Sequence, residues 1–587
     1  YDTIIRYGGF QNLKSIIESV TLGTLCLVAI SYIMGSNIPR SIFVIYWLLL
    51  IFFLFFIRAL ARLYFLQSER GFDRRKAVII YGAGAAGRQL AAALRHSPEY
   101  FPVAFVDDKK SLWKMSVQGL KVCPPFSLGR LLFKLKVKNV FLALPKEAKA
   151  RRHEIILLLE KFRVHVRTIP GLNDLVEGTA AISEFSEVSV EDILGRDPVP
   201  PVETLLKKCI KDKNVLITGG GGSIGSELCR QIMRLDPRIL VILDISEHNL
   251  YKIDHELRAV KQKLSKNFSI IPVLGSVCDP LRLTKLLKKY SIHTLYHAAA
   301  YKHVPLVESN SLEGTKNNIE GTYLTAKASY DLGLENFVLI STDKAVRPTN
   351  VMGASKRFSE LILQAFAQKS SSTIFSMVRF GNVINSSGSV VPLFREQIRK
   401  KEAITLTHKD ITRYFMTIPE AAELVLQASS LAKGGDVFVL DMGESVKIAN
   451  LARRMIHLMG RTIRSAKNMD GDIEIKITGL RPGEKLYEEL LIGEKSFGTE
   501  HPKILKAEEV FHSFETIESA MALLRQSWQD YDAQMLKNTL QELVAGYTPQ
   551  GNELDILSLS NVSEKLRNRN KKLTEDASIF IRNESLH

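Results

Sequence analysis

Asn214-Val-Leu-Ile-Thr218-Gly219-Gly-Gly-Gly222-Ser-Ile-Gly225 is the stretch that decides the fold of this 587-residue chain. Its first five residues are a short, mostly apolar run that ends at a glycine cluster, which predicts a strand buried on both faces. The glycines let the backbone approach a pyrophosphate, whose charge then faces the N-terminus of the following helix. The spacing therefore predicts a strand, a dinucleotide-binding turn and a helix, in that order.

Five further apolar runs follow this turn, and helical segments separate them. The runs are residues 239–244, 269–274, 294–297, 337–340 and 374–379. This alternation indicates an α/β fold with a doubly wound parallel sheet. The shorter elements of 404–500 predict a small substrate-binding cap. We expect the catalytic domain to span 205–505 and a helical, then polar, tail to occupy 506–587.

The turn and the strand ends together predict a cofactor site. Asp244 ends the second strand, where a carboxylate accepts hydrogen bonds from ribose hydroxyls and repels a 2′-phosphate, so we expect NAD rather than NADP. Asp279 lies where an acid commonly holds the adenine amine, although a helix N-cap before Pro280 explains it nearly as well. Ala298 and Ala299 are small, as required beside the nicotinamide half of the cofactor. The predicted cofactor residues are Thr218, Gly219, Gly222, Ser223, Ile224, Gly225, Asp244, Asp279, Ala298, Ala299 and Lys356.

A second segment carries the candidate chemistry. The spacing Met352-x-x-x-Lys356 stands where a short-chain dehydrogenase/reductase carries Tyr-x-x-x-Lys. A thioether cannot move the proton that a phenol moves during hydride transfer. Either the chain is inactive, or its proton chemistry has moved to Thr342, Asp343 and Lys344. These three follow a predicted strand directly, at the carboxyl end where a doubly wound sheet places its site.

The first half of the chain repeats the strand–turn–helix pattern. Residues 77–82 read as a buried strand, and Gly82-x-Gly84-x-x-Gly87 opens a helix. Asp107 lies 20 residues after Gly87, where a ribose-binding acid is expected. We predict a first Rossmann-like domain over 72–195. A ligand-binding regulatory module and a purely structural spacer remain equally good interpretations of it.

Two apolar runs precede this domain, within a predicted transmembrane region over 1–66. Residues 13–34 contain Glu18, whereas residues 41–57 carry no charge and approach the length needed to cross a bilayer core of about 30 Å. Arginine and lysine residues follow the second run, and such positive flanks stay in the cytoplasm. We therefore expect two spans with a cytoplasmic remainder, and the non-methionine start suggests further spans upstream.

The net charge and the cysteine content limit the kinds of partner and site that we expect for this chain. The net charge is +17, but the basic residues are spread along the chain without a recognition motif, so a basic surface beside anionic lipid is favoured over nucleic-acid binding. The five cysteines show neither a CxxC motif nor a histidine-paired spacing. Disulfides and a metal site are therefore not expected, consistent with a reducing cytosol.

Six segments together resemble one family, the membrane-anchored nucleotide-sugar 4,6-dehydratases of bacterial polysaccharide and glycan biosynthesis, of the UDP-N-acetylglucosamine 4,6-dehydratase type. The segments are 218–228, 297–308, 341–357, 378–394, 411–428 and 480–490. The resemblance covers nearly the whole chain and includes Met352, since the large membrane-bound members also carry methionine there. It implies a UDP-sugar substrate, a tightly bound and recycled NAD, contact with inner-membrane lipid and, in typical members, four N-terminal spans.

The resemblance also implies roles for individual residues. Asp343 is expected to protonate the departing C6 oxygen, Lys344 to remove the C5 proton, Thr342 to hydrogen-bond the C4 oxygen and Lys356 to bind the nicotinamide ribose. The C4 proton leaves through Thr342 and a water or directly to Asp343, and the sequence leaves this choice open. The expected substrate-binding residues are Lys302, His303, Asn382, Arg413 and Arg481.

Two alternatives to the dehydratase stay open at this point. One is a nucleotide-sugar 4-epimerase on the same fold, against which Met352 argues because such epimerases rely on the tyrosine. The other is a catalytically silent membrane scaffold or NAD sensor, against which the intact Thr342, Asp343, Lys344 and Lys356 argue. We expect a multi-pass protein of the bacterial inner membrane with catalytic domains in the cytoplasm; a homo-oligomer stays open.

Overall fold

The computed structural model describes residues 10–35, 39–68, 75–95, 97–144, 149–168, 186–187, 192–193, 199–264, 267–370, 372–386, 388–466, 468–489, 496–550 and 555–558. The chain divides into two compact units, residues 1–139 and 140–587. Each unit is described by itself.

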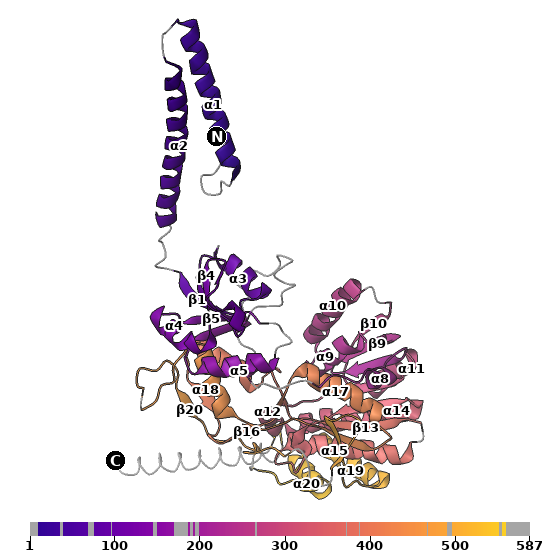
Figure 1. The fold of residues 1–587 in the computed structure, drawn as a ribbon. Helices are drawn as coiled ribbons and strands as arrows, with labels where there is room; N and C mark the ends of the chain where they lie inside the picture. The colour runs from indigo at the N-terminus through magenta and orange to yellow at the C-terminus, as the bar shows by residue number, and fades with distance from the viewer. Residues whose placement is uncertain are drawn as a thin grey trace, which may run out of the picture. The chain divides into compact units, whose positions relative to one another are not determined.

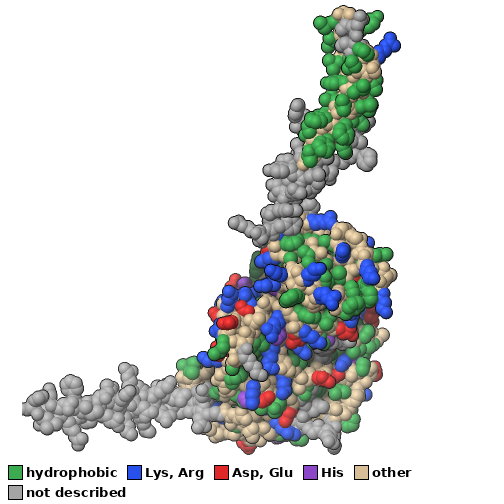
Figure 2. All heavy atoms as spheres, turned by 60° about the vertical axis from the view of Figure 1, so that its left-hand side comes forward, with side chains coloured by type: hydrophobic (Ala, Val, Ile, Leu, Met, Phe, Trp, Pro, Cys, Tyr) green, Lys and Arg blue, Asp and Glu red, His purple; other side chains and the backbone are tan. Residues whose placement is uncertain are grey.

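The first unit begins with a helical hairpin. Helices α1 (Phe10–Ile33) and α2 (Arg40–Ser68) lie side by side, and Trp47 Nε1 donates to Thr21 Oγ1 at 3.0 Å (Figure 1). Apolar side chains cover the hairpin surface (Figure 2). One stretch, Arg40–Ile57, is long and apolar enough to cross a membrane, with a mean hydropathy of 2.4, whereas the apolar part of α1 is shorter. Among the described residues, the predicted span over 41–57 is therefore matched by a membrane-length helix, and the predicted span over 13–34 is not confirmed.

The first sheet follows the predicted strand–turn–helix order. Strand β1 (Lys76–Tyr81) leads through the glycine turn into α3 (Ala85–Arg95), and β1 pairs in parallel with β2 (Tyr100–Val106). Asp107 directly follows β2 and accepts a hydrogen bond from the Ala83 N–H at 2.7 Å. Within the first unit the strand order is β3-β4-β2-β1, with β3 (Ser116–Val117) and β4 (Leu120–Cys123). Strands β5 (Asn139–Leu142), β6 (His165–Thr168) and β7 (Ser186–Glu187) fall, apart from Asn139, in the second unit.

The second unit contains a nine-stranded sheet of order β10-β9-β8-β11-β12-β13-β18-β22-β21. Its strands are β8 (Asn214–Thr218), β9 (Ile239–Asp244), β10 (Ser269–Leu274), β11 (Thr294–His297), β12 (Asn336–Ile340), β13 (Ile374–Arg379), β18 (Asp436–Leu440), β21 (Ser496–Gly498) and β22 (Ile504–Ala507). The pairings from β10 to β18 are parallel, and β22 and β21 are antiparallel. All six strands that the sequence predicts here are confirmed.

Both faces of this sheet are buried under helices. Along β12, Phe337 and Leu339 belong to one apolar core and Val338 to another, because successive side chains of a strand point to opposite faces. Helices on one face include α11 (Pro280–Lys289), α14 (Gly321–Leu332) and α15 (Val351–Lys369); those on the other include α9 (Ser223–Ile232), α10 (Glu247–Leu264) and α17 (Ile418–Leu431). This arrangement is the doubly wound fold expected from the sequence.

Short strand pairs form the region expected to cap the site. They are β14 (Asn382–Val383) with β17 (Phe415–Met416), β15 (Ile404–Leu406) with β20 (Ile475–Ile477), and β16 (Thr412–Arg413) with β19 (Val446–Lys447). Two strands within 404–500 depart from the expectation: β18 and β21 lie in the main sheet. Helices α19 (Phe514–Gln529) and α20 (Ala533–Leu543) pack against α15, so this part of the expected tail belongs to the core.

Candidate active site

The glycine turn after β8 has no room for side chains where the backbone folds back on itself. Gly219 has a φ of +66°, and a Cβ there would lie 2.7 Å from the backbone of Ala299. A Cβ on Gly225 would lie 2.1 Å from the Gly219 carbonyl oxygen. Helix α9 starts directly after Gly222, so its free N–H groups point toward the turn, as a pyrophosphate requires. These residues fit a dinucleotide.

Asp244 and Asp279, the two carboxylates predicted to bind the cofactor, have different contacts in the structure. Asp244 ends β9 and accepts hydrogen bonds from the N–H groups of Gly221 and Ser246, both at 2.8 Å, which fixes it beside the turn. Asp107 holds the first domain's turn in the same way. Asp279 instead caps α11, accepting from the Arg282 N–H at 3.0 Å, and its side chain is exposed. The N-cap interpretation of Asp279 is therefore the one that its geometry supports.

A cavity of about 390 Å³ opens between the glycine turn and the carboxyl ends of β11, β12 and β13. The predicted residues that line it are Gly219, Gly222, Ser223, Ile224, Gly225, Ala298, Lys302, His303, Thr342, Lys344, Met352, Lys356 and Asn382. Thr218, Asp244, Asp279, Ala299, Asp343, Arg413 and Arg481 are not among its lining residues. One cavity thus brings together most of the predicted cofactor residues and the candidate catalytic groups.

Thr342, Asp343 and Lys344 form the turn that follows β12. Thr342 caps a single 3₁₀ turn, Asp343–Ala345, and its hydroxyl donates to Asp343 Oδ1 at 2.9 Å. Lys344 Nζ donates to the same oxygen at 3.0 Å and to Asn382 Oδ1 at 3.3 Å. Asp343 is buried, and its Oδ2 has no hydrogen-bond partner within the described residues. The turn therefore presents an acid and an amine that share one hydrogen bond.

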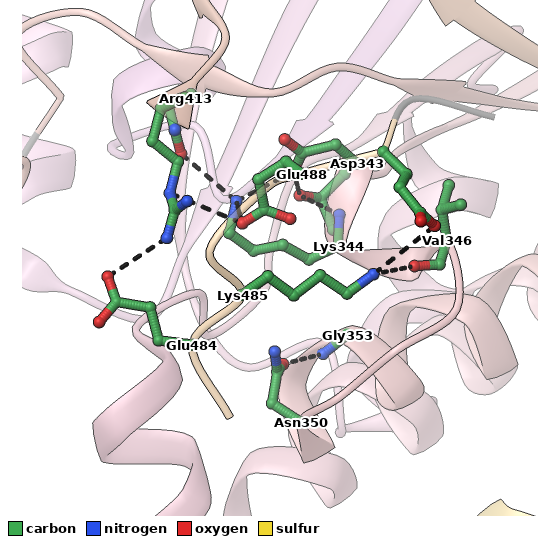
Figure 3. Close-up of polar contacts among 12 residues, drawn as sticks. Asp343, Lys344, Val346, Asn350, Gly353, Arg413, Glu484, Lys485 and Glu488 are labelled. Atoms are coloured by element: carbon green, nitrogen blue, oxygen red, sulfur yellow. Dashed lines mark hydrogen bonds and ion pairs between the residues drawn. The ribbon is translucent and has the colours of Figure 1, made fainter. Parts of the chain in front are cut away.

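Glu488 is a member of this site that the sequence interpretation missed. Its Oε1 lies 3.5 Å from Lys344 Nζ and 3.7 Å from Arg413 Nε, and Figure 3 shows it between these two cations. The side chain is buried, and among the described residues its Oε2 has no hydrogen-bond partner. Burial opposes the charge of Lys344, but Asp343 and Glu488 together raise its pKa above the ordinary value. Lys344 is thus held as an ammonium in this structure.

The two arginines expected to bind phosphate are placed differently. Arg413 is buried and forms ion pairs with Glu488 and, at 3.2 Å, with Glu484 (Figure 3). Arg481 is exposed, and its backbone N–H donates to Glu484 at 3.2 Å. Lys485 of the same loop donates to the carbonyl oxygen of Val346 at 2.9 Å, which links the loop to the turn that follows β12.

Met352 and Lys356 lie one turn apart on α15. Asn350 caps this helix by accepting from the Gly353 N–H at 2.8 Å, and Glu308 accepts from the Val351 N–H. The side chains of Met352 and Lys356 both line the cavity. Met352 is only 3% exposed, and Lys356 is 5% exposed. Burial lowers the pKa of Lys356 to about 8, against the opposing effect of Glu360. The lysine that remains from the Tyr-x-x-x-Lys spacing therefore loses its proton more readily than an ordinary lysine.

Lys302 and His303 follow β11 and line the same cavity as Thr342 and Lys344. Burial lowers the pKa of Lys302, and burial together with Lys302 lowers that of His303. Both side chains are consistent with their predicted place in the substrate site.

A network of buried ion pairs contacts Ser341, directly before the Thr342–Lys344 turn, and no local pattern in the sequence predicts it. Glu360 on α15 accepts from Ser341 Oγ at 2.6 Å and from Arg379 Nε at 2.8 Å. Arg357 donates to Glu360 at 2.9 Å, and Glu509 pairs with both arginines. Burial alone would raise the pKa of Glu360, but the two arginines and Ser341 lower it to about 2. The network fixes the residue directly before Thr342.

This fold and cavity define the class of the protein: an extended short-chain dehydrogenase/reductase of the nucleotide-sugar dehydratase and epimerase type. The chain belongs to the family described as polysaccharide biosynthesis protein, which matches residues 215–509. A second family, described as CoA-binding domain, matches residues 1–170. The expected family resemblance is thereby confirmed at this level.

Individual relatives cover either most of the chain or its catalytic half. The chain is 38% identical over 496 residues to the capsular polysaccharide biosynthesis protein CapD of Staphylococcus aureus, covering 84% of this chain and 81% of that protein. It is 40% identical over 497 residues to the probable polysaccharide biosynthesis protein EpsC of Bacillus subtilis (strain 168), with 84% and 81% covered. The UDP-glucose 4-epimerase of Rickettsia rickettsii (strain Sheila Smith) is 32% identical over 286 residues, 48% of this chain and 79% of that protein.

Proposed function

We propose that the protein catalyses the 4,6-dehydration of UDP-N-acetylglucosamine to the 4-keto-6-deoxy sugar nucleotide, for polysaccharide or glycan biosynthesis. The observation that carries the proposal is the hydrogen-bonded pair of Asp343 and Lys344 beside the cavity, with Met352 where a catalytic tyrosine stands in related folds. An elimination needs an acid for the leaving oxygen and a base for the adjacent carbon, and this pair supplies both.

NAD is the proposed cofactor. Gly219, Gly222 and Gly225 would hold its pyrophosphate at the start of α9, and Asp244 would accept hydrogen bonds from the adenosine ribose. When bound, it supplies the hydride acceptor for C4 and the donor that returns the hydride to C6, so it is regenerated in each turnover. Lys356 lies at the cavity wall, where it can bind the second ribose.

Asp343 and Lys344 must exchange one proton before they can act in these roles. The contacts of Lys344 favour its ammonium form, whereas elimination needs a protonated acid at the C6 oxygen and a neutral amine at C5. Transfer of one proton across the 3.0 Å hydrogen bond from Lys344 Nζ to Asp343 Oδ1 creates both states in a single step. The ketone at C4 acidifies the C5–H bond, which lets a lysine amine remove that proton.

The substrate diphosphate is proposed to engage Asn382, Arg413 and Arg481, and Lys302 and His303 are the other proposed substrate-binding residues. Arg413 is held by Glu484 and Glu488, so an incoming diphosphate has to replace carboxylate contacts with phosphate contacts. Such exchange couples occupancy of the nucleotide site to Glu488 and hence to Lys344. The choice of UDP-N-acetylglucosamine rests on the family resemblance.

The main rival is a nucleotide-sugar 4-epimerase, because the catalytic half of the chain is similar to a protein named UDP-glucose 4-epimerase. An epimerase needs to oxidise and reduce C4 only, and has no use for an acid–base pair at C5 and C6. Met352 and the Asp343–Lys344 pair therefore favour dehydration. A catalytically silent scaffold would not require the Asp343–Lys344 pair.

Incubation of the full chain with UDP-N-acetylglucosamine tests the proposal, with the product followed by mass spectrometry and NMR. We expect loss of one water and a 4-keto-6-deoxy sugar. Conversion to the C4 epimer without water loss would instead establish the epimerase, and an unchanged substrate in the presence of bound NAD would favour the scaffold. UDP-glucose in a parallel incubation tests the proposed preference for the acetamido sugar.

We also propose that the protein is anchored in the bacterial inner membrane with its catalytic unit in the cytoplasm. The membrane-length stretch Arg40–Ile57 and the following positive charges support this placement. Resistance to alkaline extraction and accessibility of the catalytic unit to protease only in inverted vesicles are the expected results. Extraction of the full chain by alkaline carbonate would contradict the anchor.

A further inference from the structure

We propose that Lys356 itself is the base that takes the C4 hydroxyl proton, in place of the tyrosine that Met352 replaces. This inference rests on the proposed function, since it concerns the oxidation step of the same site. It answers the question that the sequence leaves between Thr342 with a water and Asp343. It also gives Lys356 a chemical role beyond binding the ribose.

The geometry of α15 brings the amine to the place where the phenol is missing. Met352 and Lys356 are four residues apart, so they lie on the same face of the helix, and both line the cavity together with Thr342. The thioether of Met352 has no proton to give or take. Lys356 is the next side chain on that face with titratable chemistry, and no hydrogen bond or ion pair engages its Nζ among the described residues.

The groups that face Lys356 do not compete for its proton. Glu360, one turn further along α15, is held by Ser341, Arg357 and Arg379. His297 at the end of β11 is hydrogen-bonded to Thr218 at 2.7 Å and Thr322 at 3.2 Å, and burial followed by the charge of Lys356 lowers its pKa to about 3. Among the other residues that line the cavity, Lys302 and Lys344 contribute only like charge.

The alternatives are less suited to the step. Thr342 already donates its hydroxyl proton to Asp343, and Asp343 also accepts from Lys344. Lys344 has a raised pKa, whereas burial lowers that of Lys356 to about 8. The positive charge of an oxidised nicotinamide would lower it further, because like charges disfavour the protonated amine. A base with a pKa close to the working pH is the most effective proton acceptor.

The step balances as a two-electron oxidation of the sugar. The C4 O–H bond breaks as an N–H bond forms on Lys356, and the electron pair left on oxygen becomes the second C–O bond of the ketone. C4 is oxidised by loss of its hydride to the dinucleotide, which is reduced. The ammonium of Lys356 then returns its proton to solvent before the next turnover.

Lys356→Arg separates this role from ribose binding, since arginine keeps a cation and several donors but does not lose its proton in proteins. The full chain is assayed in three ways: equilibrium binding of NAD, single-turnover oxidation at C4, and solvent-deuterium exchange at C5 of added 4-keto product. The exchange needs the C5 base but no oxidation of C4. Lys327→Arg is the matched control, because Lys327 is exposed on α14 and pairs with the equally exposed Asp331.

The proposal predicts that Lys356→Arg lowers C4 oxidation by about 100-fold or more, while NAD binding and C5 exchange stay within about threefold of the parent chain. In the parent, the oxidation rate should fall about tenfold per pH unit below the pKa of Lys356. Oxidation by Lys356→Arg at the parent rate would overturn the assignment and leave the dehydratase standing. A parent chain that neither oxidises C4 nor exchanges C5 would overturn the proposed function itself, and the Lys356 assignment with it.

Discussion

Lys344 Nζ lies 3.0 Å from Asp343 Oδ1, so the proposed base and the proposed acid of the elimination share one proton. Glu488, which is also buried, approaches the same ammonium from another element. Two carboxylates around one lysine favour the resting ion pair and oppose the tautomer that reacts. The resting ion pair must therefore change to the reactive tautomer before the proposed elimination can begin. Substitutions of Asp343, Lys344 and Glu488 should each have a different effect on activity.

Asp343→Asn should remove the acid while retaining the size and most hydrogen bonds of the side chain. We expect dehydration to fall by about 100-fold to 10,000-fold, because a positioned acid contributes that much to a proton transfer. Exchange of the C5 proton of added 4-keto product should survive, since Lys344 remains and loses the carboxylate that raises its pKa. Unchanged dehydration by this variant would exclude Asp343 as the acid.

Glu488→Gln should shift the pH dependence of C5 exchange. Glu488 raises the pKa of Lys344, so its neutralisation lowers that pKa and makes the neutral amine available at lower pH. The rising limb of the exchange rate should therefore move to lower pH than in the parent chain. The comparison variant is Glu489→Gln, the neighbouring residue, and equal pH profiles for Glu488→Gln and the parent would show that Glu488 does not act on Lys344.

Glu360→Gln should destabilise the catalytic unit, because it leaves Glu509 as the one carboxylate that pairs with both Arg357 and the fully buried Arg379, so the network keeps one uncompensated positive charge. Removing one partner of a buried ion pair costs about 3–5 kcal/mol. The expected result is an earlier urea-unfolding midpoint together with a loss of C4 oxidation, since Ser341 loses the acceptor that fixes it before Thr342. Glu396→Gln removes a carboxylate from the exposed pair with Lys400 and should leave the midpoint unchanged. Equal midpoints for the two variants would contradict the structural role of the network.

His297 should make the catalytic unit sensitive to acid. Its folded-state pKa is about 3 because burial disfavours the imidazolium, whereas an unfolded histidine has a pKa of about 6.5. The unfolded chain therefore binds the additional proton between these values, and stability is present above pH 6.5 and is lost as the pH falls toward 3. The slope is about 1.4 kcal/mol per pH unit for one such group. Urea unfolding at several pH values should show a shallower slope for His297→Gln, and parallel slopes would refute the assignment.

The elements that dominate the fold could be predicted from local sequence. Strand β8, the glycine turn and α9 follow from periodicity and backbone freedom, and the position of Thr342-Asp343-Lys344 at a strand end follows from the topology. The same reasoning brings Lys302, His303, Asn382 and Lys356 to one cavity. Local patterns are enough here because each signal lies within a single strand–turn–helix unit.

What sequence could not supply depends on contacts between distant segments. Glu488 meets Lys344 across 144 residues, and nothing in its loop distinguishes it from its neighbour Glu489. Strand β18 was expected in the cap, because a five-residue apolar run does not reveal which sheet it joins. The network of Glu360 and Arg379 joins α15 and β13 to the segments that follow β12 and β22, and its charges resemble ordinary surface residues until burial is known. The lowered pKa of Lys356 likewise depends on the burial of its side chain.

Label transfer within the sugar tests the central claim most directly. The full chain is given UDP-N-acetylglucosamine carrying deuterium at C4, in ordinary water, and the product is analysed by NMR. The account predicts loss of water, a ketone at C4 and the deuterium at C6 of the same sugar, with hydrogen from solvent at C5. Deuterium retained at C4, in the starting sugar or in its C4 epimer and with no loss of water, would contradict the account.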